Sequence, residues 1–246
     1  MFVCAALIAA ALLPIRAGAQ ERSVKPFQLI DQALARWRAR PRPLQLSYVV
    51  NFTGHNKNSE FHRRFRVDDR VTDHATQVTM LVSEGPAPPF VEPEKQRLLP
   101  TETFGFVPSE ARFAAPTPAP SATNLPVIAA VHAKIHYPYD VSLIGIENVS
   151  NRTAYHLQLD PRQARDAYPL RDLWIDTSTF DVLQVVAQQF EHIGPIAVPY
   201  RVNARYAEQG PYWLISHAEA AATIHAGIFS YGSSADADFE DFEYAP

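Results

Sequence analysis

Cysteine is nearly absent from this chain of 246 residues, in which Cys4 is the only one. An internal disulfide is therefore excluded, and thiol chemistry has no residue to depend on beyond this position. Glycine is also scarce, and the nine glycines form neither a G-x-G-x-x-G fingerprint nor a phosphate-binding loop. The G-x-S-x-G motif is missing as well. These absences argue against disulfide-rich, dinucleotide-binding and serine-hydrolase proteins.

Neither sign of charge dominates the chain. The formal net charge of −4 gives no basic signature, so no nucleic-acid partner is predicted. The charges are nevertheless segregated, with 11 Lys or Arg and 5 Asp or Glu in residues 21–70, and 7 acids without a basic residue in 207–246. Two solvated surfaces are the simpler interpretation. The alternative is peripheral contact with an anionic membrane surface through a basic patch of Arg36, Arg38, Arg40 and Arg42.

Long apolar runs are limited to the start of the sequence. Phe2 to Ile15 is almost wholly apolar, and Ala17-Gly18-Ala19 follows as an A-x-A cleavage pattern. The run is too short to cross a bilayer comfortably. It departs from the usual pattern because no Lys or Arg precedes it. The sequence therefore predicts a signal peptide over residues 1–19 and an extracytoplasmic protein, either periplasmic or secreted.

An amphipathic helix is predicted shortly after this run. Phe27, Ile30, Leu34 and Trp37 recur at spacings of three and four residues, which is the helical period. Pro26 is tolerated in a first turn, and two further prolines end the pattern within a few residues of Trp37. This apolar stripe is expected to pack against the core.

Short segments with alternating apolar residues fill most of the remaining chain. Between residues 172 and 226 such segments follow one another with only short turns between them. Strands joined this closely must be antiparallel neighbours, because a parallel return needs a longer crossover. Near the C-terminus the apolar phase changes around Glu240 and Asp241, which predicts a β-bulge. The predicted fold is α+β and mostly β, with a large antiparallel half-barrel sheet wrapped around the N-terminal amphipathic helix.

Proline is concentrated in one part of the chain. Ten of the 21 prolines fall between Gly85 and Pro126, which excludes regular sheet across most of that interval. We therefore predict a single domain over residues 20–246 with a Pro-rich insertion at 85–126. The insertion contains three phenylalanines that either form a lid or merely fix a surface loop. These lid candidates are Phe104, Phe106 and Phe113.

No pattern of metal-ligating or catalytic residues stands out. His132 and His136 lie on a predicted strand, where their spacing of about 13 Å is too long for one ion. The acidic residues between 236 and 243 lack the glycine of a calcium loop and are typical of a solvated, edge-protecting strand. The chain is therefore predicted to be a non-enzymatic protein that binds no metal and no cofactor. The alternative is a secreted hydrolase with an acid–base pair drawn from His217, His225, Asp176 and Glu219.

The order of one amphipathic helix, a long antiparallel sheet and a Pro-rich insertion resembles the LolA/LolB-like lipoprotein-carrier superfamily. Two short segments add to the resemblance, Leu173-Trp174-Ile175-Asp176-Thr177 at a strand end and Tyr212-Trp213-Leu214 at a strand start. The resemblance implies a half-open barrel whose concave face holds acyl chains or another lipid. No specific arginine of the family matches Arg63, Arg64 or Arg66, and the Pro-rich insertion departs from the short carriers.

Together, the residues and the resemblance predict a non-enzymatic module that binds a hydrophobic ligand in a cleft between the helix and the sheet. The ligand would be an acyl chain, another lipid or a lipoprotein, so the expected partner is a lipid or an acylated protein. The alternative is a protein-interaction or sensory domain that contacts another envelope protein through its sheet edge or Pro-rich segment. The residues predicted to line the cleft are Phe27, Ile30, Leu34, Trp37, Tyr48, Val50, Phe65, Met80, Tyr206 and Trp213.

Overall fold

The computed structural model describes eight stretches of the chain. The predicted signal peptide, Phe113, the pair His132 and His136, and most of the Pro-rich insertion lie outside them. Among the described residues, no helix is long and apolar enough to span a membrane. The described stretches are residues 25–56, 59–70, 75–86, 100–106, 138–162, 167–193, 196–226 and 229–245.

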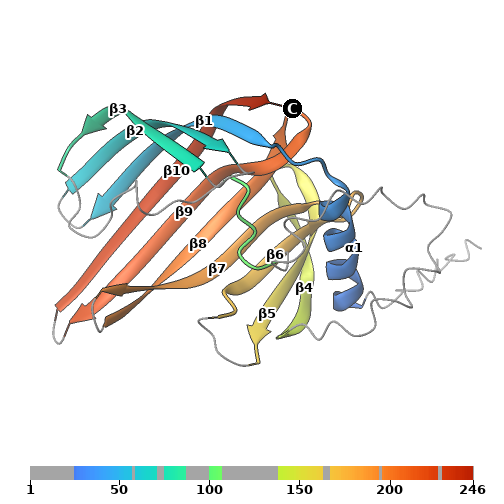
Figure 1. Ribbon diagram of the computed structural model, residues 1–246. Coiled ribbons are helices and arrows are strands. Elements are labelled where there is room, and N and C mark those ends of the chain that lie inside the picture. Colours follow the sequence, from blue (N-terminus) through green and yellow to red (C-terminus); the bar gives the residue numbers. More distant parts are fainter. Residues whose placement is uncertain are drawn as a thin grey trace, which may run out of the picture.

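In the described part of the chain, ten antiparallel strands form one sheet in the order β3-β2-β1-β10-β9-β8-β7-β6-β5-β4 (Figure 1). The first strand pairs with the last, so β1 and β10 join two meanders in the middle of the sheet. This topology confirms the antiparallel sheet predicted from the closely spaced alternating segments. The strands are β1 (Gln45–Asn56), β2 (Ser59–Arg70), β3 (Ala75–Glu84), β4 (Tyr139–Val149), β5 (Arg152–Pro161), β6 (Leu170–Asp176), β7 (Val182–Ile193), β8 (Ile196–Gln209), β9 (Tyr212–Ala226) and β10 (Phe229–Ala245).

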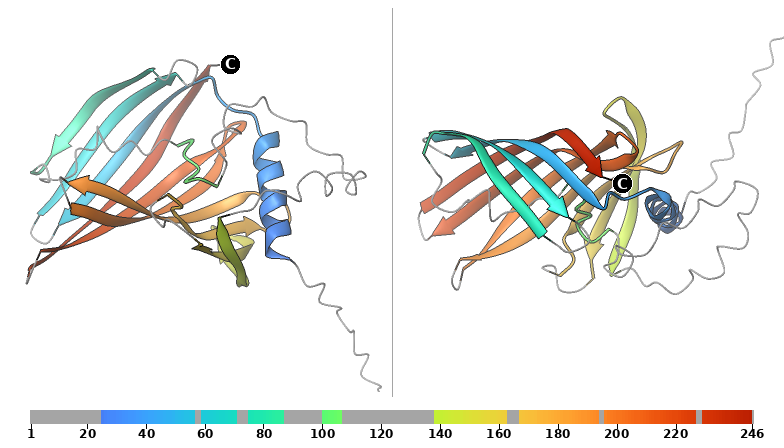
Figure 2. Two further views of the ribbon diagram at one scale, coloured as in Figure 1. Left: turned by 60° about the horizontal axis from the view of Figure 1, so that its bottom comes forward. Right: turned by 45° about the horizontal axis from the view of Figure 1, so that its top comes forward.

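The sheet has an apolar inner face and a more polar outer face. On β2, Phe61, Phe65 and Val67 are buried, whereas the alternating residues His62 and Arg64 are exposed. A twisted sheet with this many strands curls, and the inner face lines the concave side of the curl (Figure 2). The predicted half-barrel is therefore confirmed, with its core on the concave side.

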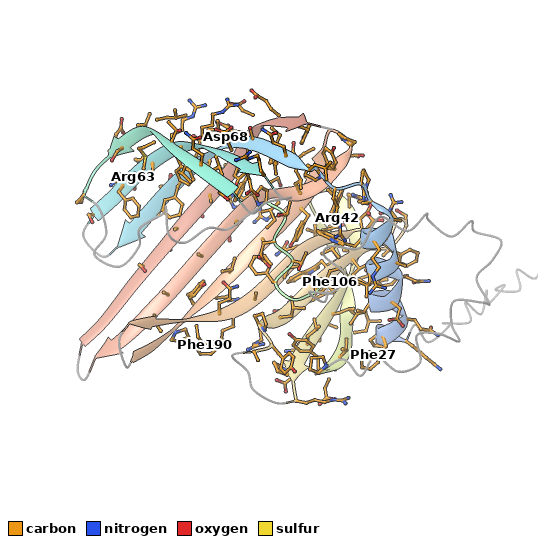
Figure 3. The ribbon with its side chains drawn as sticks, in the orientation of Figure 1. Phe27, Arg42, Arg63, Asp68, Phe106 and Phe190 are labelled. Carbon is orange, nitrogen blue, oxygen red and sulfur yellow. The ribbon has the colours of Figure 1, made fainter. Side chains whose placement is uncertain are left out.

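The helix α1 (Pro26–Ala39) lies at one end of the half-barrel, next to β4 (Figures 1 and 2). Phe27 is 39% exposed, in contrast to the expectation that it packs against the core (Figure 3). The buried stripe instead begins at Leu29, and it contains Leu29 and Ala33 in addition to the predicted Ile30 and Leu34. The buried helix residues are Leu29, Ile30, Ala33 and Leu34.

The acidic sequence of β10 suggested a strand that protects an edge of the sheet, but β10 does not lie at an edge. It lies between β1 and β9, because the last strand pairs with the first. Its acids Glu240, Asp241 and Glu243 pair instead with Arg64 and Arg66 of β2. The predicted bulge is confirmed, because the register between β1 and β10 shifts at this point and Asp241 has a φ of 51°.

Candidate functional site

Side chains occupy the space between α1 and the sheet. Trp37 of the helix meets Tyr206 and Phe106 edge-on, with ring centroids 5.5 and 6.2 Å apart. Phe104 and Phe106 are only 2% and 4% exposed, and Figure 3 places Phe106 near the helix. Aromatic pairs of this geometry contribute about 0.5–1.5 kcal/mol beyond the area that they bury. At this end of the half-barrel, the protein's own side chains therefore lie where the cleft was predicted.

The segment 100–106 is held on the inner face by hydrogen bonds. The Ile215 amide donates to the Pro100 carbonyl at 2.8 Å, and the Tyr206 hydroxyl donates to the Glu102 carbonyl at 2.7 Å. The Glu102 carboxylate also accepts bonds from the amides of the next two residues. The turn that carries the two buried phenylalanines is therefore fixed against β8 and β9.

A buried ion cluster ties the helix to the turn between β6 and β7. The Asp181 carboxylate accepts a hydrogen bond from Arg36 at 2.9 Å and two from Arg40 at 2.7 and 2.9 Å. The guanidinium groups of Arg40 and Arg152 lie 4.4 and 5.4 Å from the ring centroid of Trp213. Burial raises the pKa of Asp181, but the arginine hydrogen bonds outweigh burial, so the pKa lies below its usual value. Two arginines of the predicted membrane-binding patch are thus engaged with a buried carboxylate.

Away from the helix, the middle of the inner face carries small side chains. Ala218 pairs with Ala237 and Ala220 with Ala235, so alanines of β9 and β10 lie side by side on this face. The members nearer the helix are buried, whereas Ala220, Ala222 and Ala235 are partly exposed. We call this surface the alanine floor, and it consists of Ala204, Ala218, Ala220, Ala222, Ala235 and Ala237.

Aromatic side chains border the alanine floor. Phe52 of β1 and Phe61 of β2 pack with ring centroids 5.7 Å apart, one and two strands from the floor. The Phe61 ring lies over Gly54, where an added Cβ would come within 2.0 Å of it. Tyr200 of β8 borders the opposite side and is partly exposed. The inner face thus has small side chains in its middle and aromatic side chains on both sides of them.

The structure divides the predicted cleft residues into two groups, with Phe27 in neither. Sequence reasoning missed the alanine floor, whose signal is the alternation of alanine with polar residues near 218–222 and 235–238. The group at the helix end consists of Ile30, Leu34, Trp37, Tyr206 and Trp213. The group on the inner face of β1 to β3 consists of the buried Tyr48, Val50 and Phe65 and the 37% exposed Met80.

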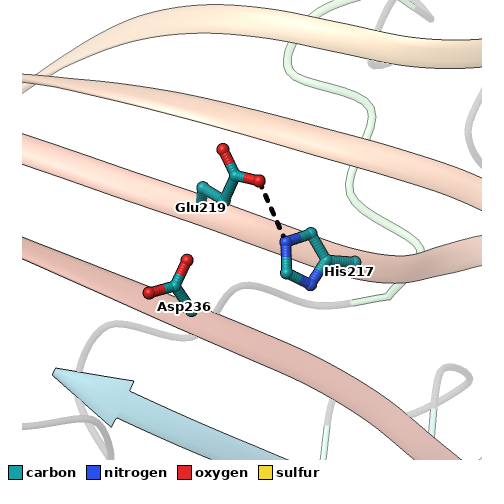
Figure 4. A group of neighbouring side chains, drawn as sticks. All are labelled: His217, Glu219 and Asp236. Carbon is teal, nitrogen blue, oxygen red and sulfur yellow. Dashed lines mark hydrogen bonds and ion pairs between the residues drawn. The ribbon is translucent and has the colours of Figure 1, made fainter. Parts of the chain in front are cut away.

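A group of imidazole and carboxylate side chains lies on the outer face, behind the alanine floor. His217 and Glu219 alternate with the floor residues of β9, and Asp238 and Asp236 are their cross-strand partners on β10. His217 Nδ1 lies 2.7 Å from Asp238 Oδ1, and His217 Nε2 lies 3.1 Å from Glu219 Oε1. Ligand atoms of His217, Glu219 and Asp236 all lie within 4.8 Å of one another (Figure 4). We call these four residues the His217 cluster.

Polar residues on both neighbouring strands extend this cluster. On β8, Asn203 and Arg205 donate to Glu219 at 3.2 and 3.0 Å. On β1, His55 Nε2 lies 3.8 Å from Asp236 Oδ2. Burial raises the pKa of Glu219, but hydrogen bonds from its neighbours and the charge of Arg205 lower the pKa more, so it lies below the usual value. Glu219 is therefore an ionised acceptor at neutral pH.

A second histidine lies between two carboxylates on β4 to β6. His156 Nδ1 lies 2.9 Å from Glu147 and its Nε2 lies 3.1 Å from Asp172. The His156 ring stacks on Trp174 at 4.2 Å, and the Trp174 indole N–H donates to Glu147 at 2.9 Å. Arg201 approaches Asp172 at 3.5 Å. Other donors therefore engage both carboxylates beside His156.

Of the residues of the hydrolase alternative, His217 and Glu219 lie together at 3.1 Å on the outer face, whereas Asp176 is engaged elsewhere. Asp176 accepts hydrogen bonds from the amides of Ser178 and Thr179 and pairs with Arg152 at 2.7 Å. It ends β6, three strands away from the β9 residues of the His217 cluster. The side chain of His225 lies outside the described part.

No family model and no curated protein matches the sequence, but solved structures match the fold. A LolA superfamily protein from Nitrosomonas europaea covers 91% of this chain and 95% of its own, at 12% identity and a TM-score of 0.38. A DUF1329 family protein from Desulfovibrio piger covers 90% and 94%, at 13% identity and a TM-score of 0.42. An outer membrane lipoprotein-sorting protein domain from Vibrio parahaemolyticus covers 89% and 93%, at 10% identity and a TM-score of 0.40. A LolA superfamily protein, of the superfamily that the sequence resembles, is among these structures, at a similarity too low to transfer a ligand or an activity.

Proposed function

We propose that this protein is an exported binding module that holds an apolar chain, such as an acyl chain, over the alanine floor. The observation that carries the proposal is the partial exposure of Ala220, Ala222 and Ala235 on the inner face, whose buried residues are mostly apolar. The signal-peptide pattern at residues 1–19 supports an extracytoplasmic location.

Small residues suit this role because they let a ligand approach the sheet closely. The aromatic rings of Phe52, Phe61 and Tyr200 then provide apolar contacts at the sides. Burial of apolar area contributes about 25 cal/mol per Å², or about 0.8 kcal/mol per methylene group, so a chain of several methylenes reaches useful affinity without a covalent step. Such contacts select for apolar surface and length rather than for a particular head group.

Neighbouring alanines of β9 provide a matched test. Ala220→Trp places an indole on the floor, whereas Ala221→Trp places the same side chain on the outer face, where Ala221 is exposed. Displacing about 60 Å² of ligand contact costs about 1.5 kcal/mol, which corresponds to an affinity about tenfold weaker. We expect this loss for Ala220→Trp only, measured by titration with a fluorescent fatty acid, with circular dichroism to confirm folding.

Equal affinities of the two variants would contradict the proposed position of the ligand. Native mass spectrometry of protein purified from its own envelope provides the second measurement, and we expect it to detect bound lipid. A protein that carries no lipid and binds no fatty acid probe would contradict the function itself.

A second candidate function is favoured by the edge strand β4. Leu143, Ile144 and Ile146 are 37%, 52% and 61% exposed, and β4 is the last strand in the described order of the sheet. An edge of this kind can accept a strand from a partner protein by β-augmentation. Ile144→Lys together with Ile146→Lys should then abolish capture of an envelope protein while fatty acid binding persists. Deletion of residues 107–126, which leaves the buried segment 100–106 in place, separates this edge from a partner site in the Pro-rich segment.

A further inference from the structure

The His217 cluster lies on the face opposite the alanine floor and has no part in the function proposed above. Two features of the strands bring it together. His217 and Glu219 are two residues apart on β9, so their side chains point to the same face. Asp236 is the direct cross-strand partner of Glu219 on β10. Three potential metal ligands thus converge from two adjacent strands that the sheet itself holds in register.

From this arrangement we propose that His217, Glu219 and Asp236 bind a divalent transition-metal ion, with Zn²⁺ as the best fit. Ligand atoms around a tetrahedral Zn²⁺ are about 3.3 Å apart when each bond is about 2.0–2.1 Å long. The distance of 3.1 Å between His217 Nε2 and Glu219 Oε1 is close to this value. Asp236 completes the group within 4.8 Å, a gap that a side-chain rotation closes.

The surroundings of His217 support ligation through Nε2. Its Nδ1 lies 2.7 Å from Asp238 Oδ1, so a neutral imidazole that donates from Nδ1 presents the lone pair of Nε2 to the ion. A carboxylate behind a ligating histidine fixes the ring and raises its basicity, as at many zinc sites. Asn203 likewise holds Glu219 through a hydrogen bond at 3.2 Å. Both ligands on β9 therefore have an orienting partner, Asp238 for His217 and Asn203 for Glu219.

Two further groups lie beside the three ligands. The side-chain oxygen of Asn203 is buried and accepts no hydrogen bond from the described residues, and its amide nitrogen donates to Glu219. His55 repeats the geometry of His217, with Nδ1 3.2 Å from Glu60 and Nε2 3.8 Å from Asp236. His55 therefore provides an additional ligand at the edge of the site.

The balance of charge and donor type selects the ion. Glu219, Asp236 and Asp238 carry three negative charges, whereas Arg205 offsets one of them from an exposed position. Imidazole nitrogen together with carboxylate oxygen suits zinc and its neighbours in the first transition row, whereas calcium and magnesium prefer oxygen ligands only. The set contains no sulfur, which excludes a thiolate site.

Calorimetric titration of the metal-stripped full chain with Zn²⁺ tests this site. We expect one saturable site whose affinity falls about 100-fold or more in His217→Gln and about 10–100-fold in Asp238→Asn, which removes only the orienting charge. His156→Gln is the matched control, because His156 also lies between two carboxylates but belongs to no group of three converging metal ligands in the described part of the chain. Its zinc affinity should stay within about twofold of the wild type.

Cobalt(II) gives a readout that does not depend on heat. Its visible absorption should appear in the wild type and in His156→Gln, and should be lost in His217→Gln. Zinc affinity that is equal in wild type and His217→Gln would overturn the proposal, as would a wild type without saturable binding. If circular dichroism shows that His217→Gln does not fold, unchanged zinc affinity of Asp238→Asn overturns the proposal in its place.

Discussion

Replacing Asp181 with alanine removes the carboxylate that holds α1 against the turn between β6 and β7. Asp181 is 3% exposed and accepts three hydrogen bonds, one from Arg36 and two from Arg40. The Arg40 side chain is itself only 13% exposed, so the substitution leaves a largely buried cation without its partner. Removing one member of a buried pair costs about 3–5 kcal/mol, and we expect the free energy of unfolding to fall by that amount.

Urea denaturation followed by tryptophan fluorescence is the suitable assay, because Trp213 contacts Arg40 of this cluster and Trp37 lies on the helix that the cluster holds. The control is Asp140→Ala, which removes an exposed carboxylate that pairs with Arg162 at 2.8 Å. An exposed pair of this kind contributes about 0.2–1 kcal/mol. If Asp181→Ala cost no more than Asp140→Ala, the inference that this cluster fixes the helix would be refuted.

The cost of Asp181→Ala should also depend on pH. The folded pKa of Asp181 is lower than its ordinary value, so its stabilising effect is fully present above the unfolded pKa of about 4. The effect is lost as the pH falls through the folded value, where the carboxyl becomes protonated in both states. The difference in unfolding free energy between wild type and variant should therefore shrink below about pH 4.

Two further predictions concern single residues of the fold. The pKa of Asp176 is lowered from 3.8 to about 2, because hydrogen bonds from Ser178 and Thr179 outweigh the effect of its burial. This shift corresponds to about 2 kcal/mol of stability at pH 7 that is lost progressively as the pH falls from about 4 to below 2, so urea denaturation of Asp176→Asn should show a deficit at pH 7 that has largely disappeared at pH 2. Gly54→Ala should lower the unfolding free energy by about 1–3 kcal/mol, because the new Cβ displaces the Phe61 ring; an unchanged urea midpoint would contradict that contact.

Local sequence patterns predicted the elements well but their partners poorly. The apolar alternation and the short turns after Asp172 required antiparallel neighbours, and the phase change near Glu240 located the bulge. The same acidic stretch suggested an edge strand, because nothing local indicates that β10 pairs with β1. Phe27 fits the helical period, yet its exposure depends on how the helix meets the sheet.

The candidate sites were still less visible in the sequence. The alanine floor and the His217 cluster alternate along the same stretches of β9 and β10, so one dipeptide pattern encodes both faces. His217 and Asp236 are distant along the chain and become neighbours only when β9 and β10 pair. Asp181 and Arg40 are likewise separated by 141 residues. Spacing along the chain cannot reveal ligands or ion pairs that depend on such contacts.

The positions of helix and strands, and the apolar face of each strand, could be predicted from the residues alone, because they follow from the backbone period and from the polarity of neighbouring side chains. The pairing of the first and last strands, the packing of side chains at the helix end, and the meeting of histidine and carboxylates on the outer face became visible only in the folded chain. Those outcomes depend on contacts between residues far apart in the chain, whose free energies exist only when the whole sheet has formed.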